Sequence, residues 1–251
     1  MKFVTPKRGE KIFEISEPLI ECKVIERRNR FLCSVEKDGE RLSVHLHDPG
    51  RLKELIYPGS KVKIRKTNGV KTKWSITFSM SDNEEILLDT RFHNGIARQF
   101  IGDNCKPEVK RGDSRFDFGL ENGFVEVKGC TMLVNNHIIF PDAPSKRGSK
   151  HLRELSTLSE NGYDCSIIFL ILRKNGFYFY PNSIIDPDFE SAFLNAIDRG
   201  VKMYFPRMSF ANGELRYFGN ASYGDSPFSD IEFYREFQKV TGNRPDNYDL
   251  I

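Results

Sequence analysis

Several features that would classify a sequence at once are missing from these 251 residues. No apolar run approaches the 18 or more residues of a membrane-spanning helix, and no apolar stretch follows the charges of residues 1–10, as it would in an export signal. The five cysteines are odd in number and widely spaced, with no C-x-x-C, so neither a disulfide framework nor a structural zinc site is indicated. We expect a soluble, cytoplasmic protein with reduced thiols and no membrane partner.

The composition supplies enough apolar side chain to build a folded core. Hydrophobic residues make up 39% of the chain and include 21 Phe, which excludes a wholly disordered or fibrous protein. At about 100–200 residues per domain, the length suits one large domain or two small ones. No internal repeat is visible.

The formal net charge of +3 conceals two halves of opposite sign. Residues 1–80 carry 18 Lys and Arg against 10 Asp and Glu, whereas residues 81–251 carry 20 against 25. A basic module joined to an acidic one is typical of an electrostatic docking surface beside a site that gathers carboxylates. Random variation of surface charge remains the alternative.

The first module has the pattern of a small barrel. Short segments rich in Val, Ile, Phe, Ser and Lys are separated by Asp-Gly, Pro-Gly and Asn-Gly turn signals. The expected strands are Leu19 to Arg27, Arg30 to Lys37, Leu42 to Leu46, Lys61 to Lys66 and Trp74 to Met80. Five such strands suit an OB-like β-barrel, a fold often used to bind nucleic acid.

The second module mixes helices and strands in the order α-β-β-β-α-β-α-β. The helices are expected at Asp89 to Ile101, with Thr90 as N-cap, at Lys150 to Ser159, and at Phe189 to Asp198. Asn122-Gly123 predicts a hairpin between two of the strands. The strands are expected at Glu108 to Arg111, Arg115 to Leu120, Gly123 to Val134, Cys165 to Arg173 and Val201 to Phe205. A terminal helix is expected from Ser226 onward.

The hairpin predicts a cluster of acidic side chains. Residues two apart on a strand point to one face, so Glu126 and Lys128 should emerge together, and the hairpin should bring Asp117 beside Glu126. Two close carboxylates are hard oxygen ligands that suit Mg²⁺ or Mn²⁺, and Glu108 could supply a third. Lys128 could stabilise charge that develops on a phosphate. The alternative for Glu126 and Lys128 is a solvated cross-strand ion pair.

A second polar cluster opens the next helix. Lys150 and His151 lie within one helical turn of Glu154 and follow Arg147, so a phosphate could bind at this helix start. The alternative for His151 is a structural residue that hydrogen-bonds within the fold. Further basic residues that we expect to contact nucleic acid are Arg28, Arg30, Lys61, Lys63, Arg65, Lys73 and Arg115.

These motifs together resemble two known groups. Asp117 followed by Glu126-Val127-Lys128 on an αβββαβ core resembles the PD-(D/E)xK nuclease superfamily. Up to about residue 220, the chain is similar to the SfsA family, the sugar fermentation stimulation proteins. The motifs that carry this similarity are Ser114-Arg115-x-Asp117-Phe118, Glu126-Val127-Lys128, Phe140-Pro141-Asp142-Ala143 and Arg147-Gly148-x-Lys150-His151-Leu152-Arg153-Glu154-Leu155.

The resemblance implies a two-domain α/β fold, with an OB-like β-barrel at residues 1–82 and a mixed αβββαβ nuclease-like domain at 83–225. Residues 226–251 form a C-terminal extension that has no counterpart in the resemblance. It implies DNA binding and catalysis by Asp117, Glu126, Lys128, Glu108, His151 and Lys150. The Mg²⁺ or Mn²⁺ would lie on Asp117, Glu126, Glu108 and the Val127 carbonyl.

Other functions stay open at this point. The main alternative is a DNA-binding transcriptional regulator of sugar (maltose) metabolism that does not cleave. RNA as the substrate is a third, and nucleases of this superfamily commonly form homodimers.

Overall fold

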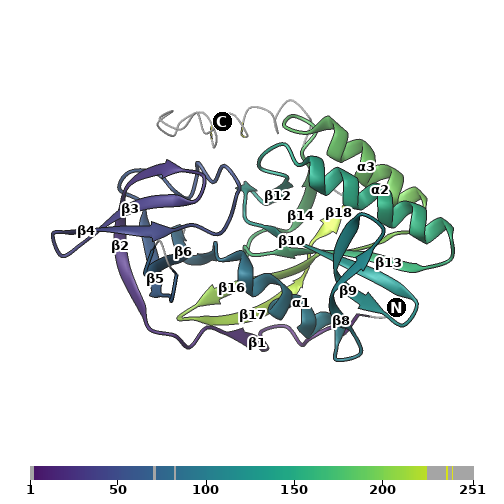
Figure 1. Ribbon diagram of the computed structural model, residues 1–251, viewed down its shortest axis with the longest axis horizontal. Helices are drawn as coiled ribbons and strands as arrows, with labels where there is room; N and C mark the ends of the chain where they lie inside the picture. The colour runs from purple at the N-terminus through teal and green to yellow at the C-terminus, as the bar shows by residue number, and fades with distance from the viewer. Residues whose placement is uncertain (1–2, 70–71, 82, 225–235, 237–238, 240–251) are drawn as a thin grey trace.

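The barrel of the first module is closed by five strands. The computed structural model describes residues 3–69, 72–81, 83–224, 236 and 239, and its barrel lies at the left of Figure 1. The strand order is β4-β3-β2-β5-β6, and β4 pairs back to β6 at His45 and Ser75. The strands are β2 (Leu19–Asn29), β3 (Leu32–Lys37), β4 (Glu40–His45), β5 (Lys61–Lys66) and β6 (Trp74–Ser81). This confirms the OB-like barrel, with β5 at its predicted bounds.

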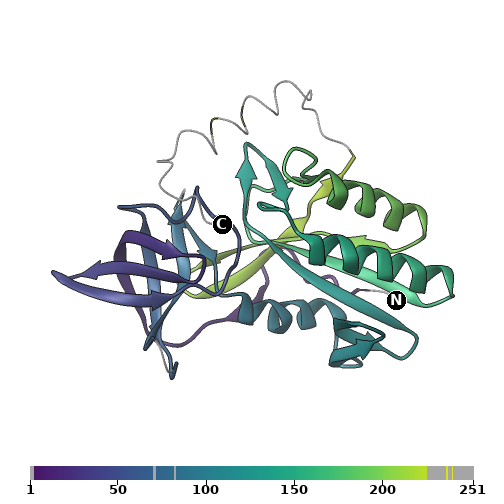
Figure 2. The same cartoon turned by 45° about the horizontal axis from the view of Figure 1, so that its top comes forward.

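The second module is a sheet covered by helices on both faces. Figure 2 shows α2 (Lys146–Glu160) and α3 (Pro187–Asp198) over one face and α1 (His93–Ile101) under the other. Apolar side chains that alternate along the strands fill both layers, so the module has two hydrophobic cores. Its strands are β8 (Lys106–Arg111), β9 (Ser114–Leu120), β10 (Gly123–Cys130), β13 (Asp164–Ile171), β15 (Lys202–Tyr204), β16 (Pro206–Ala211) and β17 (Glu214–Asn220). The two-domain α/β class is therefore confirmed.

Backbone hydrogen bonds tie the two modules into one sheet. Strand β7 (Glu84–Leu87) pairs with β6 of the barrel on one side and with β16 on the other. Strand β1 (Lys11–Glu14) pairs with β17, so the start of the chain also joins the second module. A continuous sheet resists bending at this junction, which fixes how the barrel faces the second module. The limits 1–82, 83–225 and 226–251 stay a prediction.

Two local predictions are wrong, and one hairpin was missed. The strand expected over 123–134 ends at Cys130, and β11 (Leu133–Val134) belongs to a separate sheet. Thr90 is not a helix N-cap, because the Asp89 side chain accepts from the Arg91 amide at the start of the 3₁₀ turn η1 (Thr90–Phe92). The hairpin β16–β17 was not predicted. The separate sheet consists of β11, β12 (His137–Phe140), β14 (Tyr178–Pro181) and β18 (Ser222–Tyr223).

The helix expected from Ser226 onward falls almost entirely outside the described residues. Within the part of the chain that the structure covers, no helix is long and apolar enough to cross a membrane.

Candidate functional site

Asp117 is held where two strands separate. Strands β9 and β10 pair from Leu120 and Gly123 as far as Phe118 and Val125. Beyond that point the Asp117 side chain bonds to β10 in place of the backbone, because its Oδ2 accepts from the Val127 amide at 2.8 Å. Its Oδ1 accepts from Nδ2 of Asn94 at 3.1 Å. Burial raises the pKa of Asp117, and the charge of Glu126 raises it further. Asp117 and Glu126 are therefore close enough for their charges to interact, and a metal ion shared between them stays a prediction.

Glu126 is a buried carboxylate in which one oxygen has hydrogen-bond partners and the other has none. It is 2% exposed, and its Oε1 contacts both Nζ of Lys128 on the same strand and Nδ1 of His151 on α2. Its Oε2 is buried without a hydrogen-bond partner. Burial by itself would raise the pKa of Glu126, but Lys128 and His151 outweigh it and hold the pKa below its usual value. The side chain is therefore an anion at neutral pH.

The donor set fits a small divalent cation. A buried carboxylate oxygen without a partner is costly, and coordination to a cation would satisfy it. Mg²⁺ commonly binds through one or two carboxylates and keeps several waters, so Asp117 and Glu126 suffice as side-chain ligands. Among the described residues there is no group of three or more His, Cys, Asp or Glu placed to hold a metal. The remaining ligands would have to be backbone oxygens or water.

Glu108 does not join this pair. Its backbone has a φ of 52°, and its side chain is 66% exposed in an ion pair with Arg115 at 3.3 Å. The contact occupies both residues on the outer surface of the β8–β9 hairpin. Neither a third ligand at Glu108 nor a phosphate contact at Arg115 gains support from this arrangement.

The structure separates Lys150 from His151. His151 is 3% exposed and lies against Glu126, so a phosphate in solution cannot reach its ring. Lys150 points to the other side of α2, where it lies 3.7 Å from Glu154 and borders a different cavity with Arg111. The interpretation of both residues as phosphate ligands at one site is therefore not supported by their placement.

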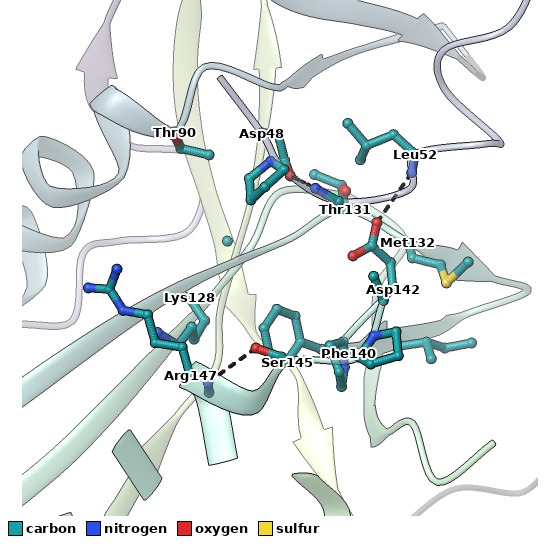
Figure 3. Close-up of a pocket in the computed structure, with 18 of the residues that line it drawn as sticks. Asp48, Leu52, Thr90, Lys128, Thr131, Met132, Phe140, Asp142, Ser145 and Arg147 are labelled. Atoms are coloured by element: carbon teal, nitrogen blue, oxygen red, sulfur yellow. Dashed lines mark hydrogen bonds between the residues drawn. The ribbon is translucent and has the colours of Figure 1, made fainter. Parts of the chain in front are cut away.

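A cavity of about 260 Å³ lies between the two modules, beside Lys128 (Figure 3). Figure 3 shows Lys128 and Arg147 on one side of it and Asp48 and Asp142 on the other. Its polar lining also includes Thr90, His93, Thr131 and Ser145, and its apolar lining includes Leu52, Met132, Ile139 and Phe140. The barrel loop of residues 48–52 forms the wall that faces the second module.

Asp142 joins that loop to the second module, and Asp48 bonds within the loop. Asp142 Oδ2 accepts from the Leu52 amide at 3.3 Å, and Asp48 Oδ1 accepts from the Gly50 amide at 2.8 Å. A Cβ on Gly50 would overlap the Asp142 carboxylate, so only glycine permits this approach. Burial and the charge of Asp142 raise the pKa of Asp48 to about 7.

The alternating cations of β5 lie on one face, as predicted, but two of them are engaged. Lys63 is paired with the buried Glu85, and Arg65 lies 3.1 Å from the fully buried Asp89. These contacts join β5 to β7 and to the segment before α1, so they hold the modules together rather than present free charge to a phosphate. The structure does not support the nucleic-acid role predicted for Lys63 and Arg65.

The other predicted nucleic-acid contacts are scattered. Arg30 and Arg147 border the cavity. Arg28 is exposed and lies 3.2 Å from Glu26. Lys61 and Lys73 are exposed on the barrel.

Sequence reasoning missed several residues of this region. Asn94 and His93 come from α1, and the pattern of that helix gives no sign that it faces the carboxylates. The His93 ring packs on Gly129, where a Cβ would overlap it, and burial lowers the pKa of His93 to about 4. Asp142 stood inside a recognised motif and Asp48 inside a turn, but neither was assigned a role.

Comparison with known proteins links this geometry to a family. A family profile described as "SfsA N-terminal OB domain" matches residues 25–88, and one described as "Sugar fermentation stimulation protein RE domain" matches residues 84–214. A sugar fermentation stimulation protein homolog of Saccharolobus solfataricus is 47% identical over 214 residues, which is 85% of this chain and 89% of that protein. The homolog of Thermoplasma volcanium is 46% identical over 202 residues, which is 80% and 93%.

A solved structure shares the whole two-module arrangement. The SfsA of Pyrococcus furiosus in complex with Ca²⁺ superposes with a TM-score of 0.79 at 26% identity and covers 86% of this chain and 99% of its own.

Proposed function

The chain belongs to the sugar fermentation stimulation protein (SfsA) family, and we propose that it is a nuclease that cleaves DNA with Mg²⁺ or Mn²⁺. The observation that carries the proposal is the buried, unpartnered Oε2 of Glu126 beside the Asp117 carboxylate. The Pyrococcus furiosus relative was solved in complex with Ca²⁺, which supports a divalent-cation site in this family.

Each residue of the site has a defined task in this proposal. Asp117 and Glu126 hold the ion, together with the Val127 carbonyl. When bound, the ion would offset the negative charge that develops on the phosphate during attack by water. Lys128 adds a second positive charge on the same face, and Arg147, on the same side of the cavity as Lys128, binds the neighbouring phosphate.

The surrounding residues keep the carboxylates in place. The Val127 amide and the Asn94 side chain each donate to a different oxygen of Asp117, so its orientation is fixed from two sides. His151 holds Oε1 of Glu126 and leaves Oε2 as the oxygen available to an ion. His151 is thus a positioning residue in this mechanism.

A second candidate is the DNA-binding regulator of sugar (maltose) metabolism that does not cleave. Lys128 and His151 already offset the charge of Glu126 without an ion, and such a balanced cluster is stable as a structural element. A regulator would bind DNA with no need of metal. The two candidates therefore differ in metal dependence.

The test is an incubation of the full chain with plasmid and with single-stranded DNA, in Mg²⁺, Mn²⁺ or EDTA. We expect metal-dependent cleavage that Asp117→Asn and Glu126→Gln abolish. Glu108→Gln is the matched control, because it removes an exposed carboxylate of the same module and should cleave normally. DNA binding without cleavage under any of these conditions would favour the regulator. RNA as the substrate and a homodimeric state stay predictions.

A further inference from the structure

We propose that the cavity between the two modules admits a single unpaired strand of DNA and excludes the intact duplex. This inference rests on the proposed function, since it names the form of DNA that the Asp117 and Glu126 site can receive. Three features of the cavity carry it: its size, its fixed roof and the arrangement of its charges.

The size of the cavity suits one nucleotide. Its volume of about 260 Å³ is just below the roughly 300–1,000 Å³ of sites that hold one small ligand. Lys128 borders the cavity and also contacts Glu126, so its side chain connects the cavity to that carboxylate. A paired double strand would not fit between the two modules.

The roof over the cavity cannot swing aside freely. It consists of Pro49 and Gly50 of the barrel, which face Ala143 and Pro144 of the second module. The Leu52 amide is bonded to Asp142, and β7 connects the sheets of both modules through backbone hydrogen bonds. Opening the cavity enough for a duplex would break these contacts. The closed form is therefore the form that selects the substrate.

The charges and apolar groups divide the cavity into two halves. Lys128 and Arg147 stand on the side opposite Asp48 and Asp142 (Figure 3). A phosphate is attracted to the two cations, so a strand would enter with its backbone on the Lys128 side. Its base would then meet the other half, where Leu52 and Met132 offer apolar surface and the carboxyl groups can accept from base amino groups.

A second hollow of about 220 Å³ adjoins the first and continues the path. The two share Arg30, Pro49, Gly50, Ala143 and Pro144 in their walls. The second hollow adds Arg51 of the barrel and the buried Arg27, whose guanidinium donates to the carbonyls of Arg30, Gly50 and Arg51. A strand that leaves the cavity would therefore follow a basic surface, as in proteins that bind single strands.

The closing experiment measures DNA binding by the full-length Glu126→Gln protein in Mn²⁺, with fluorescein-labelled oligonucleotides. The probes are a single strand, the blunt duplex of the same sequence and a single-stranded RNA of that sequence. We expect the single strand of DNA to bind about tenfold or more tightly than the duplex, the factor that a lost stacked base would give. Equal or tighter binding of the duplex would overturn the proposal, and tighter binding of the RNA would overturn the choice of DNA.

Blocking variants test whether the strand lies in this cavity. Ala143→Trp should reduce single-strand binding about tenfold, because the indole would fill the passage beneath the roof. Pro49→Trp should fill the passage from the barrel side, and it replaces Ala143→Trp in the experiment if that variant unfolds. The matched control is Ala211→Trp on the β16–β17 turn, which should bind like the parent. Unchanged single-strand binding in a folded blocking variant would overturn the proposal.

Cleavage by the unsubstituted chain separates this inference from the proposed function. Single-strand selectivity without any cleavage would sustain the inference and refute the nuclease. Duplex plasmid cut as fast as single-stranded DNA would sustain the nuclease and refute the inference.

Discussion

His151 Nδ1 lies against Oε1 of Glu126, and this contact joins helix α2 to strand β10 beneath the candidate metal site. Both side chains are almost fully buried, at 4% and 3% exposure. Glu126 thereby receives a partner from the helix in addition to Lys128 from its own strand. His151 therefore acts on the carboxylate itself and not on a phosphate in the cavity.

Removal of His151 should weaken metal binding at neutral pH. In His151→Ala, Glu126 loses one of the two contacts that lower its pKa, so its pKa should rise and the pH at which Mn²⁺ binds should shift upward. The lost hydrogen bond to a buried charge should cost about 1–3 kcal/mol of unfolding free energy. Calorimetric Mn²⁺ titrations at several pH values, with chemical denaturation alongside, measure both effects.

His151→Gln is the matched variant, because its amide can still donate to Glu126. It should recover most of the Mn²⁺ affinity. If His151→Ala binds Mn²⁺ with the parent's affinity and pH profile, the proposed link between the two residues is wrong.

Mn²⁺ affinity should also depend on the protonation of Asp117. Burial raises the pKa of this carboxyl, and its protonated form cannot bind a cation, so affinity should increase as the pH rises through the raised pKa. Asn94→Ala removes a hydrogen bond that lowers this pKa and should move the transition to higher pH. Asn136→Ala, at an exposed turn between β11 and β12, should leave it unchanged. An unshifted transition in Asn94→Ala would contradict this assignment.

Alternation along single strands was the part of the site that the sequence could predict. Glu126 and Lys128 are two residues apart on β10, so they share a face wherever that strand lies. Val127 packs into the core on the opposite face, as expected. The contacts of Asn94 and His151 depend instead on how two helices dock onto the two faces of the sheet. That docking is set by long-range packing, which no local pattern records.

Two of the six Asn-Gly pairs in the sequence illustrate why turn signals are incomplete. Asn212 and Gly213 both have positive φ and form the two-residue turn between β16 and β17. In the predicted hairpin the loop residues are Glu121 and Asn122, and Gly123 opens strand β10. Gly123 is required because a Cβ there would overlap the Asp164 carbonyl of the neighbouring strand. A glycine can thus mark a close approach between strands rather than a turn.

Truncation of Leu155 should destabilise the second module strongly. Leu155 is fully buried between α2 and the sheet, so Leu155→Ala removes apolar contacts and leaves a cavity, at a cost of about 2–5 kcal/mol. Leu158 lies one turn further along the same helix and is only partly buried, so Leu158→Ala should cost clearly less. Urea denaturation followed by circular dichroism compares them. Equal losses would mean that the helix is not docked as described.

Just after the barrel loop lies a carboxyl group, that of Glu54, whose ionisation should oppose folding. Glu54 is 8% exposed, its Oε1 has no hydrogen-bond partner, and burial together with Asp142 raises its pKa from 4.5 to about 7. The folded chain then retains the proton to higher pH than the unfolded chain. Its contribution to stability is therefore lost as the pH rises from about 4.5 to about 7, by on the order of 3 kcal/mol.

Glu54→Gln should remove that loss, so the variant should be more stable than the parent at pH 8 and similar at pH 4.5. Thermal unfolding across this pH range measures the difference. Glu40→Gln, at an exposed position of the barrel, is the control and should follow the parent at every pH. If the parent and Glu54→Gln lose the same stability as the pH rises, the titrating group is not Glu54.

Lys63 should contribute to stability and not to DNA affinity. It pairs with Glu85, which is 5% exposed and also accepts from the Gly213 amide at 2.9 Å, so the pair connects β5 of the barrel with the β16–β17 turn. Lys63→Ala leaves a buried carboxylate with one partner fewer, and the loss of one member of a buried pair costs about 3–5 kcal/mol. Lys61→Ala, on the same face but exposed, should cost little.

Chemical denaturation measures these losses of stability. The salt dependence of DNA binding should keep the parent's slope in Lys63→Ala, because no phosphate contact is lost. If Lys63→Ala flattens the salt dependence of DNA binding and leaves the stability unchanged, Lys63 contacts DNA after all.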